Sequence, residues 1–120
     1  MKESGEMYLE SIYVLLKSKN SVRSIDIAEY LNYSKPSVSR AVGLLKKEGF
    51  IEVDKDGFIT LTDSGKKTAK NIFDRHTVIT KLLISFGIDE ETASEDACRM
   101  EHVISPKTFN AMKKHLEKNK

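Results

Sequence analysis

The chain has 120 residues, of which 39% are hydrophobic and 32% are charged, and its formal net charge is +2 at pH 7. This length indicates one domain or two very small ones, and the composition is typical of a soluble helical protein rather than a disordered or collagen-like one. No apolar stretch approaches the roughly 20 residues of a membrane-spanning helix, and the N-terminal segment lacks the apolar core of a signal peptide. We therefore expect a cytoplasmic protein, in agreement with the single cysteine, Cys98.

The charges are distributed unevenly along the chain. Residues 34–47 contain four basic side chains and no acidic one, whereas residues 88–101 contain six acidic side chains and one arginine. A basic segment favours contact with phosphate groups and an acidic segment favours cations, although each is also compatible with a solvated helix face.

Apolar residues at helical spacing predict two helices at the start of the chain. The first covers about residues 4–17 and the second covers residues 24–31. Ser24 is the expected N-cap of the second helix, because a serine hydroxyl can accept a hydrogen bond from a free backbone amide of the first turn. The residues expected to face inward from this helix are Ile25, Ala28 and Leu31, with Ile27 nearby.

A third helix and a β-hairpin follow. Ser34 is expected to cap this helix, Pro36 lies in its first turn and Gly49 is expected to end it. Its expected buried stripe consists of Val38, Val42 and Leu45. Residues 50–62 then alternate apolar and polar side chains around an Asp-Gly pair at positions 56–57, which predicts a hairpin.

Three more helices are predicted in the second half. A long helix runs from about Asp63 to Phe86 and stops at Gly87. Asp89 is expected to cap a helix that reaches about His102, and Ser105-Pro106 to start the last one. The stripe expected on the long helix consists of Ile72, His76, Ile79, Leu83 and Phe86. The last helix carries Phe109, Met112 and Leu116 on one face.

The order helix, helix, short turn, helix and hairpin is typical of a winged helix-turn-helix, which places one helix in the major groove of DNA. The start of the third helix carries short polar and basic side chains, which allow close approach to a duplex. The candidate DNA-binding residues are Ser34, Lys35, Pro36, Ser37, Ser39 and Arg40. Among them, Arg40 is suited to a bidentate pair with a guanine edge.

The second half contains the motif Cys-x-x-Glu-His, whose three side chains can share one helix face. Thiolate, carboxylate and imidazole together suit a transition metal better than calcium or magnesium. Three ligands do not complete a coordination shell, so further donors are sought on the first and the long helix. The candidate metal ligands are Met7, Glu10, His76, Cys98, Glu101 and His102. Taken singly, a cysteine or histidine at such a position is more often an ordinary packed residue.

Five stretches of the chain carry a resemblance to a known family. They are EMYLESIY (6–13), DIAEYLNYSKPSVSRAV (26–42), LTDSGKK (61–67), RH (75–76) and DACRMEHVIS (96–105). Together they resemble the diphtheria toxin repressor and manganese transport regulator family. The resemblance implies a mainly α protein with a winged helix-turn-helix DNA-binding domain, including a small β-hairpin wing, at residues 1–62. A helical dimerisation and metal-binding domain is then expected at residues 63–120.

The resemblance also implies a function and a ligand set. The expected function is that of a repressor that binds palindromic operator DNA as a homodimer when Fe(II) or Mn(II) occupies its sensor site, controlling genes of metal homeostasis. Met7, Cys98, Glu101 and His102 match the ligands of the iron-responsive branch. The manganese-responsive branch has an aspartate at the methionine position and a glutamate at the cysteine position. Ligands of the manganese branch are nevertheless retained here as Glu10 and His76.

Two departures from the family pattern qualify this expectation. The iron branch has an ancillary site, of which His76 is kept while Thr80 and Ser94 replace the other two ligands. Iron-branch members commonly carry an SH3-like domain after the helical region, and we expect none in this chain. The soft donors Met7 and Cys98 shift the expected preference from Mn(II) toward Fe(II), with Co(II), Ni(II) or Zn(II) binding in vitro.

Other functions remain open on the sequence alone. A winged-helix regulator that senses redox state through Cys98 is the main alternative, although no second cysteine is present to resolve an oxidised thiol. A winged-helix module that binds protein instead of DNA is disfavoured by the basic third helix. An enzyme is not expected, because the chain shows no nucleophile–base motif, phosphate loop or cofactor motif.

Overall fold

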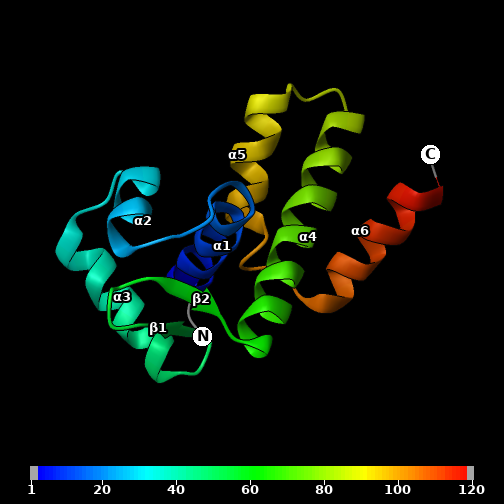
Figure 1. Cartoon of the computed structure of the whole chain (residues 1–120). Helices are drawn as coiled ribbons and strands as arrows, with labels where there is room; N and C mark the ends of the chain where they lie inside the picture. Colours follow the sequence, from blue (N-terminus) through cyan, green and yellow to red (C-terminus); the bar gives the residue numbers. More distant parts are fainter. Residues whose placement is uncertain (1–2, 119–120) are drawn as a thin grey trace. The chain divides into compact units, whose positions relative to one another are not determined.

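The computed structural model describes residues 3–118, and this part of the chain forms six helices and one two-stranded sheet (Figure 1). In chain order they are α1 (Glu3–Ser18), α2 (Ser24–Leu31), α3 (Lys35–Lys47), β1 (Ile51–Val53), β2 (Ile59–Leu61), α4 (Asp63–Ser85), α5 (Glu90–Met100) and α6 (Pro106–Lys118). This order confirms the predicted mainly helical fold with a hairpin after the third helix.

Internal contacts divide the chain into two compact units, one ending at Lys70 and the other beginning at Asn71. Helix α4 contributes to both units, because it continues without interruption from Asp63 to Ser85. The domain boundary expected between residues 62 and 63 stays a prediction.

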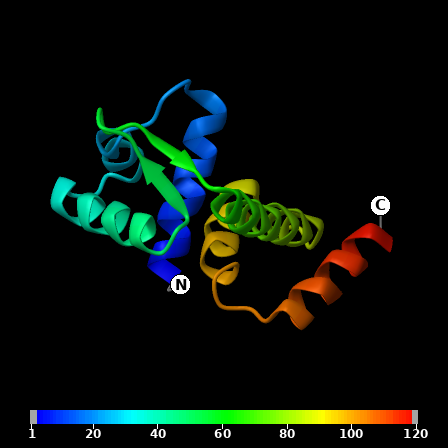
Figure 2. The same cartoon turned by 60° about the horizontal axis from the view of Figure 1, so that its bottom comes forward.

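The N-terminal unit packs α1, α2 and α3 around one apolar core that the hairpin closes (Figures 1 and 2). Each of its elements contributes at least one almost fully buried aliphatic side chain. They include Leu9, Ile12, Ile27, Val38, Leu45, Ile51 and Ile59. Burying such a side chain stabilises a fold by about 1.5–3 kcal/mol relative to leaving it exposed. This core holds α3 in place while its other face remains exposed.

Helix α2 covers the expected residues 24–31, but its N-cap differs from the prediction. Its N-cap is Arg23, whose backbone amide donates a hydrogen bond of 2.7 Å to the Asp26 carboxylate. The prediction of Ser24 as the N-cap is therefore wrong, because the Asp26 carboxylate stabilises Arg23 in the N-cap position. Ile25 is 40% exposed and does not face inward, since it lies about 200° around the helix from the buried Ile27.

The turn between α2 and α3 has a defined geometry. Asn32 adopts the left-handed conformation with φ of 57°, and the Tyr33 amide donates a hydrogen bond of 3.1 Å to the Ala28 carbonyl. Ser34 then caps α3, as predicted, by accepting a hydrogen bond of 3.3 Å from the Ser37 amide.

Helix α3 ends in a Schellman motif. Gly49 has φ of 85°, and the Phe50 amide donates to the Leu45 carbonyl at 3.1 Å. Gly49 thus ends the helix as predicted, with Glu48 as the C-cap residue itself. The predicted stripe is also confirmed, with buried residues Val38, Val42 and Leu45.

Strands β1 and β2 form the predicted antiparallel hairpin, in which Ile51 pairs with Leu61 and Val53 with Ile59 (Figure 2). The connection comprises residues 54–58 rather than a two-residue turn at the Asp-Gly pair. The Asp54 carboxylate organises this loop by accepting hydrogen bonds of 2.9 Å from the amides of Asp56 and Phe58.

The C-terminal unit contains most of α4 together with α5 and α6. Asp89 caps α5, as predicted, by accepting a hydrogen bond of 3.0 Å from the Thr92 amide. The expected stripe on α4 is confirmed at Ile72 and Ile79, which are buried, but it is wrong at Phe86, which is 63% exposed. Phe86 lies beyond the last residue of the helix, so the helical spacing no longer sets its direction.

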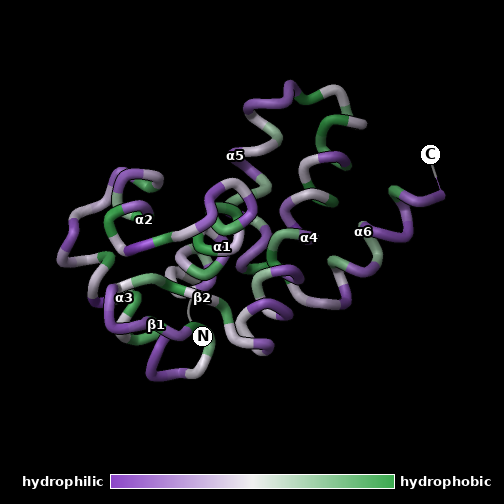
Figure 3. The backbone as a smooth tube through the Cα atoms, viewed as in Figure 1, coloured by the Kyte–Doolittle hydropathy of each residue, from purple (hydrophilic) through white to green (hydrophobic). Residues whose placement is uncertain are grey.

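Helix α6 is amphipathic but has no fully buried residue. Its predicted apolar face is present, since Phe109, Met112 and Leu116 are half-buried among exposed neighbours. The alternation of hydrophilic and hydrophobic positions along α4 and α6 is visible in Figure 3. Among the described residues, no helix is both long and apolar enough to cross a membrane.

Candidate metal centre and DNA-binding helix

A fully buried carboxylate lies at the end of α5. Ala93, Ala97 and Glu101 recur at a spacing of four, so they occupy the buried face of this helix. The Glu101 side chain has no exposed surface. Burying an ionised carboxylate is costly unless opposite charges or hydrogen-bond donors surround it. The groups that surround the Glu101 carboxylate therefore indicate why a charge can be buried at this position.

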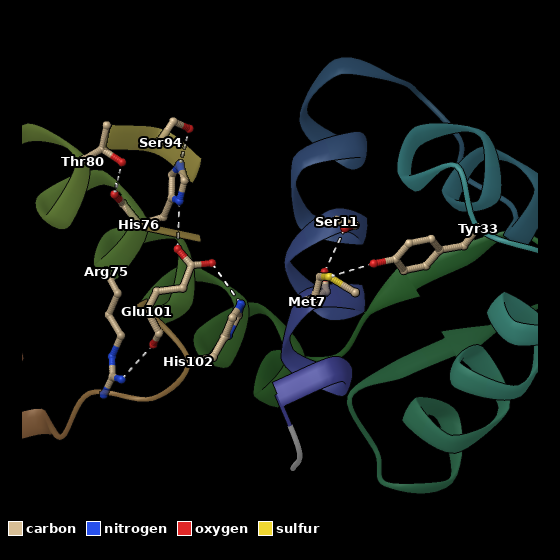
Figure 4. A network of polar contacts seen from close by, with 9 residues as sticks. All are labelled: Met7, Ser11, Tyr33, Arg75, His76, Thr80, Ser94, Glu101 and His102. Atoms are coloured by element: carbon tan, nitrogen blue, oxygen red, sulfur yellow. Dashed lines mark hydrogen bonds and ion pairs between the residues drawn. The ribbon is translucent and has the colours of Figure 1, made fainter. Parts of the chain in front are cut away.

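Two imidazoles flank the Glu101 carboxylate (Figure 4). Nδ1 of His76, on α4, lies 2.9 Å from Oε2 of Glu101. Nε2 of His102, the next residue in the chain, lies 3.2 Å from Oε1. The His102 side chain is 9% exposed and that of His76 is 26% exposed. The structure thus brings together three of the predicted ligands within the C-terminal unit.

The His76 ring is also contacted at its second nitrogen. Ser94 Oγ, on α5, lies 3.4 Å from His76 Nε2. The Thr80 hydroxyl donates a hydrogen bond of 2.7 Å to the His76 backbone carbonyl. Ser94 and Thr80 occupy the two positions at which the ancillary ligands of the iron branch are missing. At position 94 the hydroxyl instead faces the imidazole, where it can help orient the ring.

Sequence reasoning missed the role of Arg75 in this centre. Its Nη1 donates hydrogen bonds to the backbone carbonyls of Glu101 at 3.2 Å and Ile104 at 3.1 Å. Its guanidinium lies 5.5 Å from the ring centroid of Phe109. Its position beside His76 in the sequence was the available signal, because adjacent residues on α4 can reach the same end of α5.

The arrangement of these donors fits a divalent transition metal. Two ligands about 2.1 Å from one octahedral ion, at right angles to each other, lie about 3 Å apart. The distances from Glu101 to His76 and to His102 match this separation. Imidazole and carboxylate donors suit ions such as iron, manganese and zinc. His76, Glu101 and His102 therefore form a candidate metal centre.

The remaining predicted ligands are described within their own units. Met7 and Glu10 are half-buried on α1, in the N-terminal unit. Cys98 is exposed on α5, whereas Glu101, three residues later, is buried. The roles of Met7, Glu10 and Cys98 as ligands stay predictions.

The six candidate DNA-binding residues all lie on the exposed side of the start of α3. The hydroxyl of Ser34 donates a hydrogen bond of 2.8 Å to that of Ser37, so both point toward the free helix N-terminus. Arg40 lies one turn further along and is also exposed. These side chains are accessible to a duplex, as sequence-specific contact requires.

The fold and the centre define a winged-helix regulator with a metal-binding helical region. Residues 1–58 match the N-terminal DNA-binding domain of iron-dependent repressors, and residues 62–120 match the metal-binding and dimerisation domain of the same proteins. The chain belongs to the iron-dependent repressor family. This confirms the family resemblance and the fold class predicted from the sequence.

Relatives of known sequence are transcriptional regulators. An uncharacterised HTH-type transcriptional regulator of Methanocaldococcus jannaschii is 37% identical over 122 residues, which cover 100% of this chain and 98% of the relative. The HTH-type transcriptional regulator MntR of Lysinibacillus sphaericus is 36% identical over 102 residues, covering 85% of this chain and 73% of that protein.

Solved structures of transcriptional regulators share the fold of this chain. The metal-dependent transcriptional regulator MtsR superposes with a TM-score of 0.88 at 26% identity, covering 98% of this chain and 55% of that one. The manganese regulator SloR superposes with a TM-score of 0.84 at 28% identity, covering 94% of this chain and 53% of that one. IdeR of T. acidophilum superposes with a TM-score of 0.80 at 26% identity, covering 93% of this chain and 53% of that one. The chain therefore spans about half the length of these three proteins.

Proposed function

We propose that this protein is a metal-dependent transcriptional repressor that binds operator DNA as a homodimer when Fe(II) or Mn(II) occupies its sensor site. The observation that carries the proposal is the buried Glu101 carboxylate, which lies within 3.2 Å of an imidazole on each side. A cation bound there would offset the cost of burying this charge. The family membership and the names of the relatives support the same function.

The proposed sensor site adds three donors to this centre. Met7 and Glu10 would supply a thioether and a carboxylate from α1, and Cys98 a thiolate from α5. Because two of these donors are soft, they shift the preference of the site from Mn(II) toward Fe(II), while metal availability in the cell decides between the two activating ions. Co(II), Ni(II) and Zn(II) should also bind in vitro. An ion that takes donors from both units would restrict their relative motion, which is a direct way to favour one DNA-binding arrangement.

DNA recognition is assigned to α3. In a homodimer bound to a palindrome, two copies of this helix enter successive major grooves about 34 Å apart. Arg40 is the proposed base-reading residue, while Ser34, Lys35, Ser37 and Ser39 contact the backbone or base edges. Pro36 supports the helix start, where its missing amide hydrogen is not needed.

The experiment compares DNA binding with and without metal. A duplex selected anaerobically from a random library with Fe(II) would be titrated in Fe(II), in Mn(II) and in chelator. Both ions should tighten binding in the wild type and in Glu95→Gln, a control on the exposed surface of α5. Glu101→Gln should abolish the metal response. Binding that ignores chelator and falls with peroxide would overturn the proposal and support the redox alternative through Cys98.

A second arm tests the recognition helix. Arg40→Ala should weaken binding to the selected duplex by about 5- to 150-fold, because a bidentate arginine–guanine pair contributes about 1–3 kcal/mol of discrimination. Lys47→Ala removes the same charge from the far end of α3 and should have a smaller effect. Equal effects of the two variants would contradict a base-reading role for Arg40.

A further inference from the structure

A side-chain contact joins α1 to the turn of the helix-turn-helix. The Tyr33 hydroxyl donates a hydrogen bond to Met7 Sδ over 3.6 Å, although the two residues are 26 positions apart in the chain (Figure 4). Both residues belong to the N-terminal unit. Met7 is a proposed metal ligand, so this contact reaches the sulfur atom that the ion would use.

The Tyr33 side chain is held in place rather than loosely attached. Its ring meets Tyr8, on α1, edge to face with centroids 6.0 Å apart and an interplanar angle of 69°. Its backbone amide donates a hydrogen bond to the carbonyl of Ala28, in α2. The left-handed Asn32 that precedes it sets the direction of the chain at this point. Tyr33 therefore has a defined position on both its backbone and its ring.

The neighbour of Tyr33 begins the recognition helix. Ser34 is the N-cap of α3, and its hydroxyl is bonded to Ser37 within the proposed DNA-binding surface. Only one peptide bond separates the residue that contacts Met7 from the residue that caps α3. A displacement of the Met7 sulfur would therefore act directly on the start of this helix.

We propose that Tyr33 is a positioning residue that orients the Met7 thioether toward the metal and links metal binding to the start of the recognition helix. This inference rests on the proposed function. A thioether sulfur accepts hydrogen bonds weakly and keeps a second lone pair for an ion. Methionine has three rotatable bonds, so a hydrogen bond that restricts them favours one direction of the sulfur. Residues outside the coordination shell commonly orient ligands in this way.

The test removes the hydroxyl while keeping the ring. Tyr33→Phe retains the edge-to-face contact with Tyr8 but loses the donor to Met7. The matched control is Tyr30→Phe, the same change at a tyrosine of α2 that is 54% exposed. Anaerobic Co(II) titration should show about tenfold weaker binding in Tyr33→Phe, near the lower limit for partners of metal ligands. Tyr30→Phe should bind like the wild type.

A double-mutant cycle with Met7→Leu identifies the route of the effect. If Tyr33 acts through the sulfur, Tyr33→Phe should have no further effect on Co(II) affinity once Met7 is replaced. The ratio of DNA affinities with and without Co(II) should fall in Tyr33→Phe. The thermal unfolding midpoint of the metal-free protein should stay near the wild-type value, because the ring packing is kept.

Three outcomes would overturn the inference. They are unchanged Co(II) affinity in Tyr33→Phe, tighter Co(II) binding in this variant, and a loss that persists in the Met7→Leu background. Tighter binding would mean that Tyr33 competes with the ion for the sulfur. A failure of the proposed function is distinguishable from all three, because the wild type itself would then bind no Co(II) and show no metal-dependent DNA binding.

Discussion

Arg75 Nη1 donates a hydrogen bond of 3.2 Å to the backbone carbonyl of Glu101, and the next residue of α4, His76, contacts the carboxylate of the same glutamate. One helix thus holds both the main chain and the side chain of the central residue of the candidate metal centre. The second hydrogen bond of Arg75, to Ile104, extends this hold into the segment that leads to α6.

Replacing Arg75 should loosen the candidate centre. Arg75→Met keeps much of the aliphatic length but leaves two carbonyls without their charged donor, which should lower the free energy of unfolding by about 1–3 kcal/mol. Co(II) affinity should fall in parallel, because the position of Glu101 is no longer maintained. Arg99→Met is the control, since the Arg99 side chain is 79% exposed on α5. Urea unfolding and Co(II) titration of both variants measure these effects, and equal stability of the two would contradict the assigned role.

Cys98 provides a spectroscopic prediction. If its thiolate binds the ion, Co(II) should produce an intense near-ultraviolet absorption band in the wild type that disappears in Cys98→Ser. Because Cys98 is exposed, the substitution should change the free energy of unfolding by no more than about 0.5 kcal/mol. A band that survives in Cys98→Ser would exclude the thiolate as its source. Co(II) binding without such a band in the wild type would favour a site of histidine and glutamate ligands.

The cap of the recognition helix should contribute measurably to stability. Ser34→Ala removes the oxygen that accepts the Ser37 amide, and we expect a loss of about 1 kcal/mol in the free energy of unfolding. Ser39→Ala makes the same change inside α3, where alanine is the better helix former, so stability should be unchanged or slightly higher. Thermal or urea unfolding of the two metal-free variants compares them directly. A smaller loss in Ser34→Ala than in Ser39→Ala would contradict the capping role.

Asp26 should contribute to the acid stability of the N-terminal unit. The Arg23 backbone amide, followed by the Lys19 ammonium, holds the pKa of the Asp26 carboxyl below its ordinary value. A group whose pKa is lowered on folding binds fewer protons when folded, so its stabilising effect is present above the ordinary aspartate pKa. This contribution should be lost progressively as the pH falls through the lowered value of the folded state.

The measurement is the free energy of unfolding as a function of pH, from neutral pH down through the range of aspartate titration. Asp26→Asn should be less stable than the wild type at neutral pH, and the difference should shrink in acid. Glu29→Gln, an exposed change on the same helix, serves as the control. A stability difference between Asp26→Asn and the wild type that stays constant from pH 7 to acid would contradict this account.

Local signals were sufficient for most of the fold. The caps at Ser34 and Asp89 and the glycine stop at Gly49 were all predicted, because each depends on hydrogen bonds within a few residues. The wrong predictions concern the cap at Ser24 and the burial of Ile25 and Phe86, where a difference of one position decides which residue caps a helix or faces the core. The N-cap of α2 lies one residue before the predicted one, and α4 ends at Ser85, so helical spacing no longer sets the direction of Phe86.

The candidate site likewise contains residues that the sequence predicted and residues whose roles only the structure showed. His76, Glu101 and His102 were predicted as ligands from their spacing and from the family resemblance, and the structure places both imidazoles within 3.2 Å of the Glu101 carboxylate. Arg75 and Tyr33 were not assigned these roles, because their partners are 26 or more residues away in the chain.

The sequence by itself determined the order of helices and hairpin, the family and the types of donor available for a metal, since these depend on local spacing and residue chemistry. Only the tertiary structure decided which donors lie within hydrogen-bond distance of the Glu101 carboxylate and which tyrosine reaches the Met7 sulfur. The physical reason is that burial and side-chain direction follow from the packing of distant segments. One residue rotates a helix by about 100°, so a shift of one position changes which group meets which partner.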